Sequence, residues 1–549
     1  MAIGLDACEL QFAEELIADG RLPNLAAARE RSARYPLVNT VEFRSELPWT
    51  QFATGRRPED LNYWSTVSFE PATYRAWSRG ACVATPFYGG PDGPFTIAFD
   101  VPHSVIDPDM NGVQVTAWGA HAPQWHRASV PEGLLTEIDR RFGQQPAFLL
   151  DFQGDWHQGE FLDQLTDAIE TGAARRAEIA RWLMEQNPEW QLFVTVFAET
   201  HVAGHHMWHG ADPNHVLRDS PTAAAARRNL IRSHEAVDRG LGRMLEDLPD
   251  DTTVILFSIH GMQSNHNDLA STVLLPELVH RLHFGDPLLE TPRWARSSGD
   301  GPVVPTSQQL CVSQIRDELP TGEPFEWRRT ARRITPDWLR AARVAATRRR
   351  PTTEAGPEVS NPHEVPTRQG MDWSAPAWYR TRWPEMRYFI LPTFSDAMVR
   401  VNLVGREPQG VIAADDYGMV LDEIEQLLAE CTDPRTGGPA VKKVLRLREG
   451  AEFDPEGPDA DLVVLWNDGI DRLHHPSTGI VGPFPLLRTG EHSSNGFMYI
   501  DSPAAEPGDH PTRSAFDVSP TILAAAGVEP PPVIEGESTV GVADASPAG

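Results

Sequence analysis

Apolar runs that are followed by carboxylate, hydroxyl or imidazole side chains constrain the fold of this chain more than any other feature of its sequence. Five segments carry such side chains: Gly4-Leu5-Asp6, Ser45 in FRSELPWTQFATG, His201 and His205 in ETHVAGHHMW, His260 in FSIHGM, and His492 in RTGEH. Each segment follows or adjoins a hydrophobic run that predicts a buried strand. Because ligands of α/β sheets usually bind at the strand ends, we expect these side chains to gather at one edge of a sheet.

The other apolar runs predict an α/β fold. The β-rich runs are VTVF (194–197), TVILFS (253–258), YFIL (388–391), VRVNL (399–403) and DLVVLW (461–466). Helical periodicity marks residues 10–17, residues 421–431 and the segment from Pro520 to Gly527. Alternation of this kind is typical of a central mixed or mostly parallel sheet covered by helices.

Residues 285–385 differ from their surroundings, because they combine Arg-rich runs, several tryptophans and a Pro-rich stretch. Two interpretations fit this composition, an inserted cap over the site or a solvated surface insertion. We therefore expect a discontinuous core of residues 1–284 and 386–540, an insertion at 285–385 and a disordered tail at 541–549.

Composition restricts the partners and the location. The formal net charge of −29 argues against binding to nucleic-acid polymers or anionic membranes, both of which recruit basic patches. The sequence has no apolar stretch of about 18 residues and no signal-peptide pattern. Its four cysteines, Cys8, Cys82, Cys311 and Cys431, lie far apart without a C-x-x-C pair, which favours reduced thiols. We expect a soluble cytoplasmic protein with no membrane partner.

The five segments resemble, in order and context, the alkaline phosphatase superfamily, and most closely its type I phosphodiesterase/nucleotide pyrophosphatase branch. In that branch GLD opens the chain, a Thr or Ser nucleophile stands nine residues before a Thr-Gly pair, D-x-x-x-H and DHG segments follow, and a G-x-H comes late. Here the matching residues are Ser45 before Thr54-Gly55, His201-Val-Ala-Gly-His205, Ile259-His260-Gly261 and Gly490-Glu491-His492. The likeness extends from residue 4 to about residue 535. It implies an alkaline phosphatase-like central sheet, sandwiched by helices and carrying an inserted cap.

The resemblance also implies an activity, that of a metal-dependent phosphoric ester hydrolase with a phosphoryl-enzyme intermediate on Ser45. Coordination to a divalent cation would lower the pKa of the serine hydroxyl, which is otherwise a poor nucleophile. Pro48 suits the first turn of a helix, whose free N–H groups would help to hold a phosphoryl group. The alternative is that Ser45 is a simple helix N-cap.

His201 and His205 are four residues apart, so on a helix both imidazoles face the same way. With His492 they make a three-histidine set that suits zinc with one open position. The metal ligands that the resemblance implies are Asp6, Ser45, His201, His205, His260 and His492, and they would hold one or two divalent ions, with Zn²⁺ as the first expectation. The alternative is that the His-rich segment, with His206, His209 and His215 nearby, is only a solvated surface or surrounds a site without binding the metal.

Two positions depart from the family pattern. The resemblance implies Asp at positions 201 and 259, where this chain has His and Ile. The second metal thereby loses a ligand, and a two-metal site becomes more positive by about two charges. Either the second ion binds weakly, a substrate phosphate recruits it, or Glu199, His266 or Asp268 supplies the ligand.

Two functional hypotheses follow. The first is an enzyme that hydrolyses a small-molecule phosphodiester or phosphomonoester, and the second is a degenerate member that acts as a binding or regulatory protein. The resemblance to a sulfatase is weak, because residues 45–49 (SELPW) lack the Pro spacing and the Arg that the formylglycine motif of sulfatases would require. The sequence selects neither a substrate nor an oligomeric state.

Overall fold

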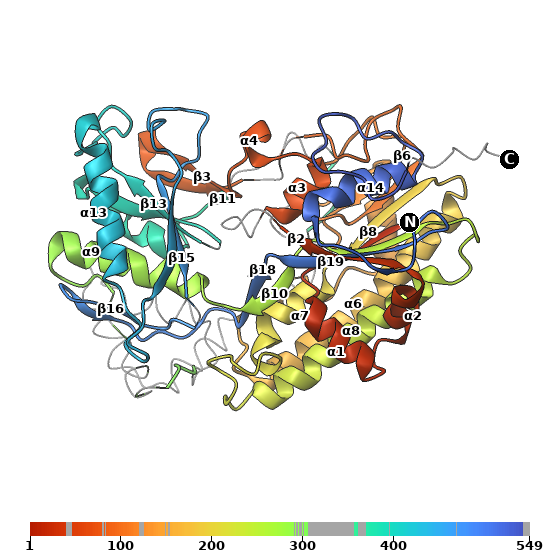
Figure 1. Ribbon diagram of the computed structural model, residues 1–549, viewed down its shortest axis with the longest axis horizontal. Coiled ribbons are helices and arrows are strands. Elements are labelled where there is room, and N and C mark those ends of the chain that lie inside the picture. The colour runs from red at the N-terminus through yellow and green to blue at the C-terminus, as the bar shows by residue number, and fades with distance from the viewer. Residues whose placement is uncertain are drawn as a thin grey trace.

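Two lobes, each with its own sheet and hydrophobic core, make up the described part of the protein (Figure 1). This computed structural model describes residues 1–39, 47–79, 82, 84–119, 126–148, 150–151, 154–289, 291, 295, 299, 301–305, 356–360, 369–394, 396–467 and 469–541. Ser45, Cys311, most of 285–385 and the end of the tail, 542–549, lie outside these residues.

The larger lobe is built on a ten-stranded sheet in the order β20-β2-β19-β9-β1-β8-β5-β6-β7, with β21 beside β2. Its middle strands, β9 (Val254–Ser258), β1 (Ala2–Leu5), β8 (Leu192–Phe197), β5 (Thr96–Phe99) and β6 (Gly112–Thr116), run parallel. Antiparallel neighbours are β19 (Asn495–Asp501) on β9, β2 (Ala33–Val38) on β19 and β7 (Ala128–Val130) on β6. The short strands β20 (Gly508–Asp509) and β21 (Arg513–Ser514) pair with β2. The predicted mixed, mostly parallel sheet is confirmed.

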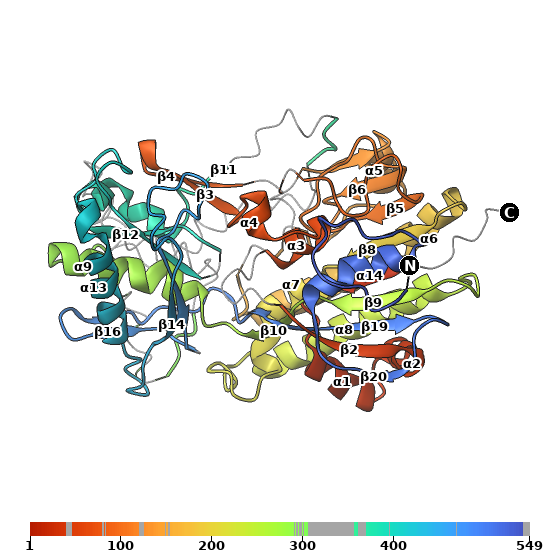
Figure 2. The same cartoon turned by 45° about the horizontal axis from the view of Figure 1, so that its top comes forward.

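Helices cover both faces of this sheet (Figure 1). One face carries α1 (Leu10–Ala18), α2 (Pro23–Arg31), α6 (Gly159–Gln186), α7 (Glu199–Met207) and α8 (Ala223–Leu245). The other face carries α3 (Pro48–Thr54) and α14 (Val518–Ala525). Successive residues of β1 alternate between the two cores, with Ile3 and Leu5 toward the first group of helices and Ala2 toward the second. Figure 2 shows β5, β6 and α5 (Leu134–Phe142) together at the end of the sheet away from β2.

The smaller lobe contains a four-stranded antiparallel sheet in the order β12-β13-β15-β14. Its strands are β12 (Tyr388–Leu391), β13 (Ala397–Val401), β14 (Val441–Arg446) and β15 (Leu462–Trp466), and its helices are α9 (Leu275–Phe284) and α13 (Tyr417–Ala429). The hairpin β3 (Val67–Glu70) and β4 (Arg75–Ser78), with β11 (Gln369–Gly370), joins this lobe through the side chains of Phe69 and Tyr74. Further elements are η3 (Ala270–Leu274), η5 (Ala375–Glu385) and the hairpin β16 (Leu473–His475) and β17 (Gly479–Val481). Short helical turns are α4 (Pro58–Leu61), η1 (Pro71–Thr73), η2 (Trp208–Gly210), η6 (Ala414–Asp416) and η7 (Ala515–Asp517).

Three of the predicted strands lie in the second sheet and not in the central one. These are the runs at 388–391, 399–403 and 461–466, which form β12, β13 and β15. The described end of the expected insertion, residues 369–385, supplies β11 and η5 to the same lobe. The division into a core and a cap at residues 285–385 stays a prediction.

None of the described helices combines the length and the apolar character needed to cross a membrane. Cys8, Cys82 and Cys431 are buried free thiols. Burial raises the pKa of Cys8 and of Cys431 to about 12 each, so both are unreactive thiols at neutral pH.

Candidate active site

Parallel pairing of β1 with β8 and β9 places the functional segments at one edge of the central sheet. Asp6 directly follows β1, α7 begins at Glu199 just beyond β8, and His260 stands two residues beyond β9. The ribbon of β10 (Gly261–Ser264) and β18 (Gly490–Ser493) pairs Met262 with His492 and so brings the late segment to the same edge. In Figure 1 this ribbon lies between the two lobes.

Two hydrogen bonds fix the end of β1 against the end of β8 and the start of α7. The backbone N–H of Asp6 donates to the carbonyl of Phe197 at 2.9 Å, and the hydroxyl of Thr200 donates to the carbonyl of Asp6 at 2.6 Å. Because Thr200 adjoins His201, the carboxylate segment and the first histidine are held at a fixed separation.

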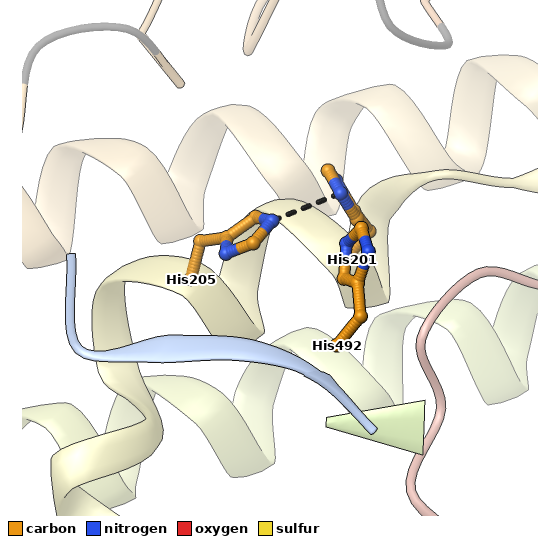
Figure 3. Close-up of side chains that lie close together, drawn as sticks. All are labelled: His201, His205 and His492. Carbon is orange, nitrogen blue, oxygen red and sulfur yellow. Dashed lines mark hydrogen bonds between the residues drawn. The ribbon is translucent and has the colours of Figure 1, made fainter. Parts of the chain in front are cut away.

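His201, His205 and His492 form one cluster (Figure 3). The Nε2 atoms of His201 and His205 are 3.0 Å apart, and one ring nitrogen of each histidine lies within 4.8 Å of the others. Two nitrogen ligands of a tetrahedral zinc ion would stand about 3.3 Å apart, so small side-chain shifts fit the cluster to zinc. The geometry thus brings together the three histidines that the sequence analysis grouped.

Hydrogen bonding and burial prepare His205 for metal binding. Its Nδ1 lies 2.7 Å from the carbonyl oxygen of Gly490, which can only accept, so Nδ1 carries the proton and the Nε2 lone pair faces the cluster. Burial, helped by the nearby charges of Arg488, His201 and His492, holds the pKa of His205 well below its usual value. At neutral pH His205 is therefore in the neutral form that binds metals.

Arg488 lies beside the histidine cluster, and the sequence analysis missed it. Its Nη1 donates to Nε2 of His205 at 3.2 Å, and its Nε and Nη2 donate to the Asp268 carboxylate at 2.9 and 3.3 Å. Asn265 also donates to Asp268, and the Arg488 side chain is 31% exposed. The only sequence signal is its position four residues before His492 in RTGEH.

Asp6 and His260 lie on the other side of the cluster. Asp6 is fully buried, and its Oδ1 accepts the indole N–H of Trp49 at 2.7 Å and lies 3.2 Å from Nε2 of His260. The ring of His260 packs against that of His492, with centroids 4.3 Å apart. Ile259 is buried at 1% exposure among apolar side chains. Trp49 is the second residue of this region that the sequence analysis did not identify.

The three side chains weighed as a replacement ligand at position 259 all have other partners. Glu199 pairs with buried Arg176 at 3.2 Å, and Asp268 holds Arg488. His266 lies 3.2 Å from the Glu491 carboxylate.

The neighbouring histidines 206, 209 and 215 likewise have their own partners. His206 contacts Asp151, His209 contacts the Thr222 hydroxyl, and His215 contacts the carbonyl of Thr489. All three are buried, so they do not form a solvated surface, and whether they only surround a metal site stays open.

Comparison with known proteins supplies the family. The sequence profile of the type I phosphodiesterase / nucleotide pyrophosphatase family matches residues 2–350. No curated protein matches the chain.

Solved structures with a similar course of the chain share little sequence with it. They include phosphonoacetate hydrolase from Sinorhizobium meliloti 1021 in complex with phosphonoformate (13% identity, 96% and 95% of the two chains covered, TM-score 0.48). Others are the wild-type alkaline phosphatase PafA (10%, 98% and 97%, TM-score 0.48) and murine ectonucleotide pyrophosphatase / phosphodiesterase 5 (10%, 98% and 96%, TM-score 0.41). Because the family profile spans more than half of the chain, the protein belongs to the type I phosphodiesterase / nucleotide pyrophosphatase family, a family of phosphoester hydrolases.

Proposed function

We propose that the protein is a metal-dependent phosphoric ester hydrolase whose metal ion, zinc first, binds to His201, His205 and His492. The observation that carries the proposal is the cluster itself, in which three imidazoles on two separate elements converge within 4.8 Å. Three histidines leave a fourth position of a tetrahedral ion open, which is typical of catalytic and not of structural zinc sites. When bound, the ion would polarise a phosphoryl oxygen and stabilise the charge that develops there.

Arg488 supports a negatively charged substrate. A guanidinium beside a cation-binding cluster is electrostatically costly unless an anion lies between the two positive charges. Asp268 holds two of the guanidinium nitrogens and leaves Nη1 directed at the cluster, where it would give up its contact with Nε2 of His205 once that lone pair binds the metal. We propose that Arg488 binds a non-bridging oxygen of the phosphate ester and that Asp268 positions the guanidinium.

Ser45 is the proposed nucleophile, on the strength of the motif. In the first half-reaction a bond forms between its Oγ and phosphorus, the ester P–O bond breaks, and the alcohol leaves with the proton that Ser45 gives up. In the second half-reaction water adds to phosphorus and releases the serine. The substrate class is a small-molecule phosphate mono- or diester.

Nitrophenyl phosphate mono- and diesters test this function directly. The zinc-loaded protein should hydrolyse at least one of them, and Ser45→Ala should abolish turnover without changing the zinc content, because only a hydroxyl is lost. Ser45→Thr is the matched control, since it keeps a hydroxyl at the same position. If the wild type cleaves none of the esters but still binds inorganic phosphate, the non-catalytic binding protein is the correct description.

A further inference from the structure

The carboxylate of Asp6 lies against the side chains of Trp49 and His260. The indole N–H of Trp49 donates to its Oδ1 at 2.7 Å, and Nε2 of His260 lies 3.2 Å from the same oxygen. The family pattern gives Asp6 and His260, with Ser45 and residue 259, to a second metal ion. An indole N–H is a donor only and cannot ligate a metal, so Trp49 takes one acceptor site of the carboxylate and adds no ligand.

Trp49 cannot easily move away from Asp6. Its side chain is 2% exposed at the start of α3, and its ring packs against Phe52 and Phe257 with centroids 5.5 and 6.2 Å apart. A Cβ added at Gly4 would lie 3.1 Å from Cη2 of the indole. Because Gly4 of β1 has no side chain, it leaves room for the ring of Trp49.

Ile259, the residue that follows β9, offers no ligand either. It belongs to one apolar cluster with Trp49, Phe52 and Phe257, at a position where the family pattern has a carboxylate. Among the residues that the structure describes, His201, His205 and His492 form the one group of three or more His, Cys, Asp or Glu side chains able to hold a metal. The residues around Asp6 do not fit a second ion.

The charges at the site also disfavour a second metal ion. Compared with the family pattern, this site lacks the carboxylates at positions 201 and 259, and the Arg488 guanidinium lies 3.2 Å from His205. A second divalent cation near the first would be repelled more strongly here than in a site with two further carboxylates.

We infer that the protein uses a single metal ion, and that Asp6, Trp49 and His260 form a metal-free group, the Asp6 cluster, in the place of the second. This inference rests on the proposed function, because it takes the three-histidine cluster as the site of the first ion. Ser45 then has no second ion beside it, and the single ion would act on the phosphate. The Asp6 cluster is a positioning group: His260 lies 3.2 Å from Asp6 and packs against His492.

Zinc content of the full chain tests the inference. After loading with excess zinc and removal of unbound metal, elemental analysis should give about one zinc per chain. The double variant Trp49→Phe/Ile259→Asp frees the Asp6 oxygen and restores a carboxylate, so it should bind about two. Trp49→Phe/Ile259→Val is the matched control, since it changes the same positions without adding a ligand and should stay at about one.

A second measurement follows the indole N–H itself. In protein labelled with ¹⁵N-tryptophan, the resonance absent from Trp49→Phe identifies Trp49, and it should not move between one equivalent and an excess of zinc. The Trp49 resonance and the zinc content of the wild type together test for a second metal ion even if the double variant does not fold. Two zinc ions in the wild type, with a shift of the Trp49 resonance at the second equivalent, would overturn it and leave the proposed function intact. A wild type that binds no zinc would overturn both.

Discussion

His205 shows how single residues determine the chemistry of this site. Its proton is held on Nδ1 by the carbonyl of Gly490, and its Nε2 faces His201 and Arg488. The carbonyl sets the tautomer, and burial keeps the ring neutral. His205 is consequently the ligand to which metal binding should be most sensitive.

We expect His205→Ala to lose bound zinc, because two histidine ligands hold zinc far more weakly than three. His209→Ala is the matched control: His209 is equally buried just beyond the same helix, but it contacts Thr222 and not the cluster. It should cost stability and keep the zinc. Zinc per chain, measured by elemental analysis, distinguishes the two variants, and unchanged zinc in His205→Ala would show that the metal is placed wrongly.

Arg488→Met should weaken the binding of inorganic phosphate to the zinc-loaded protein by about 10- to 100-fold, as expected for one charge-assisted hydrogen bond. Arg488→Lys keeps the charge but loses the two-point contact with Asp268, so its affinity should lie between those of the wild type and Arg488→Met. Phosphate inhibition of nitrophenyl ester hydrolysis gives the affinities. Equal affinities in all three proteins would remove Arg488 from the substrate site.

Sequence predicted part of this site for identifiable reasons. The four-residue spacing of His201 and His205 was enough to predict that both rings face the same way, because residues four apart lie on the same face of a helix. Trp49 and Arg488 could not be found, because their contacts depend on how α3 and the loop before β18 lie against other elements. The hydrophobicity of Trp49 predicts that its side chain is buried. It does not predict that the indole N–H donates to Asp6.

At the scale of elements, α7 depends on a buried ionic network. Arg176 of α6 contacts Asp100 at 2.8 Å and Glu199, the first residue of α7, at 3.2 Å, and all three side chains are buried. Gln145 donates a further hydrogen bond to Glu199. Because α7 carries His201 and His205, the network sets the position of both proposed metal ligands.

Arg176→Met should lower the free energy of unfolding by about 3–5 kcal/mol, because it leaves two buried carboxylates without their partner. It should also weaken zinc binding, since the start of α7 loses its anchor. Arg181→Met is the control in the same helix, because Arg181 makes exposed ion pairs with Glu246 and Asp247 and its loss should cost less than about 1 kcal/mol. Urea denaturation of the metal-free proteins measures both changes, and similar losses in the two variants would contradict this role of Arg176.

The strands illustrate what the apolar pattern can predict. All five predicted β-rich runs contribute to strands, yet three of them form the antiparallel sheet of the smaller lobe. Continuous apolar runs are typical of strands buried on both faces, and β12 and β13 are buried throughout just as β8 and β9 are. Burial is thus encoded locally, whereas the choice of sheet depends on partners far away in the sequence.

At the scale of the whole molecule, buried neutral histidines make stability depend on pH. Burial lowers the pKa of His234 from the ordinary value of 6.5 to about 4. Below pH 6.5 the unfolded chain therefore takes up a proton at this residue that the folded protein does not. The free energy of unfolding must fall as the pH is lowered from about 6.5 to about 4, by up to about 1.4 kcal/mol per pH unit for this histidine.

His234→Gln isolates this contribution. The wild type should lose stability more steeply than the variant between pH 6 and about pH 4, because glutamine does not titrate. Urea denaturation of both metal-free proteins at several pH values gives the two slopes, and their comparison removes the contributions of all other groups. Parallel slopes would mean that His234 is protonated in the folded protein.

The central claim is that the larger lobe hydrolyses phosphate esters through a metal ion at His201, His205 and His492. Its most direct test is the hydrolysis rate of a nitrophenyl phosphate ester by metal-free protein to which zinc is returned stepwise. The rate should rise from near zero and reach its plateau at about one equivalent of zinc per chain. A rate that is the same with and without zinc, or no hydrolysis at any zinc concentration, would contradict the account.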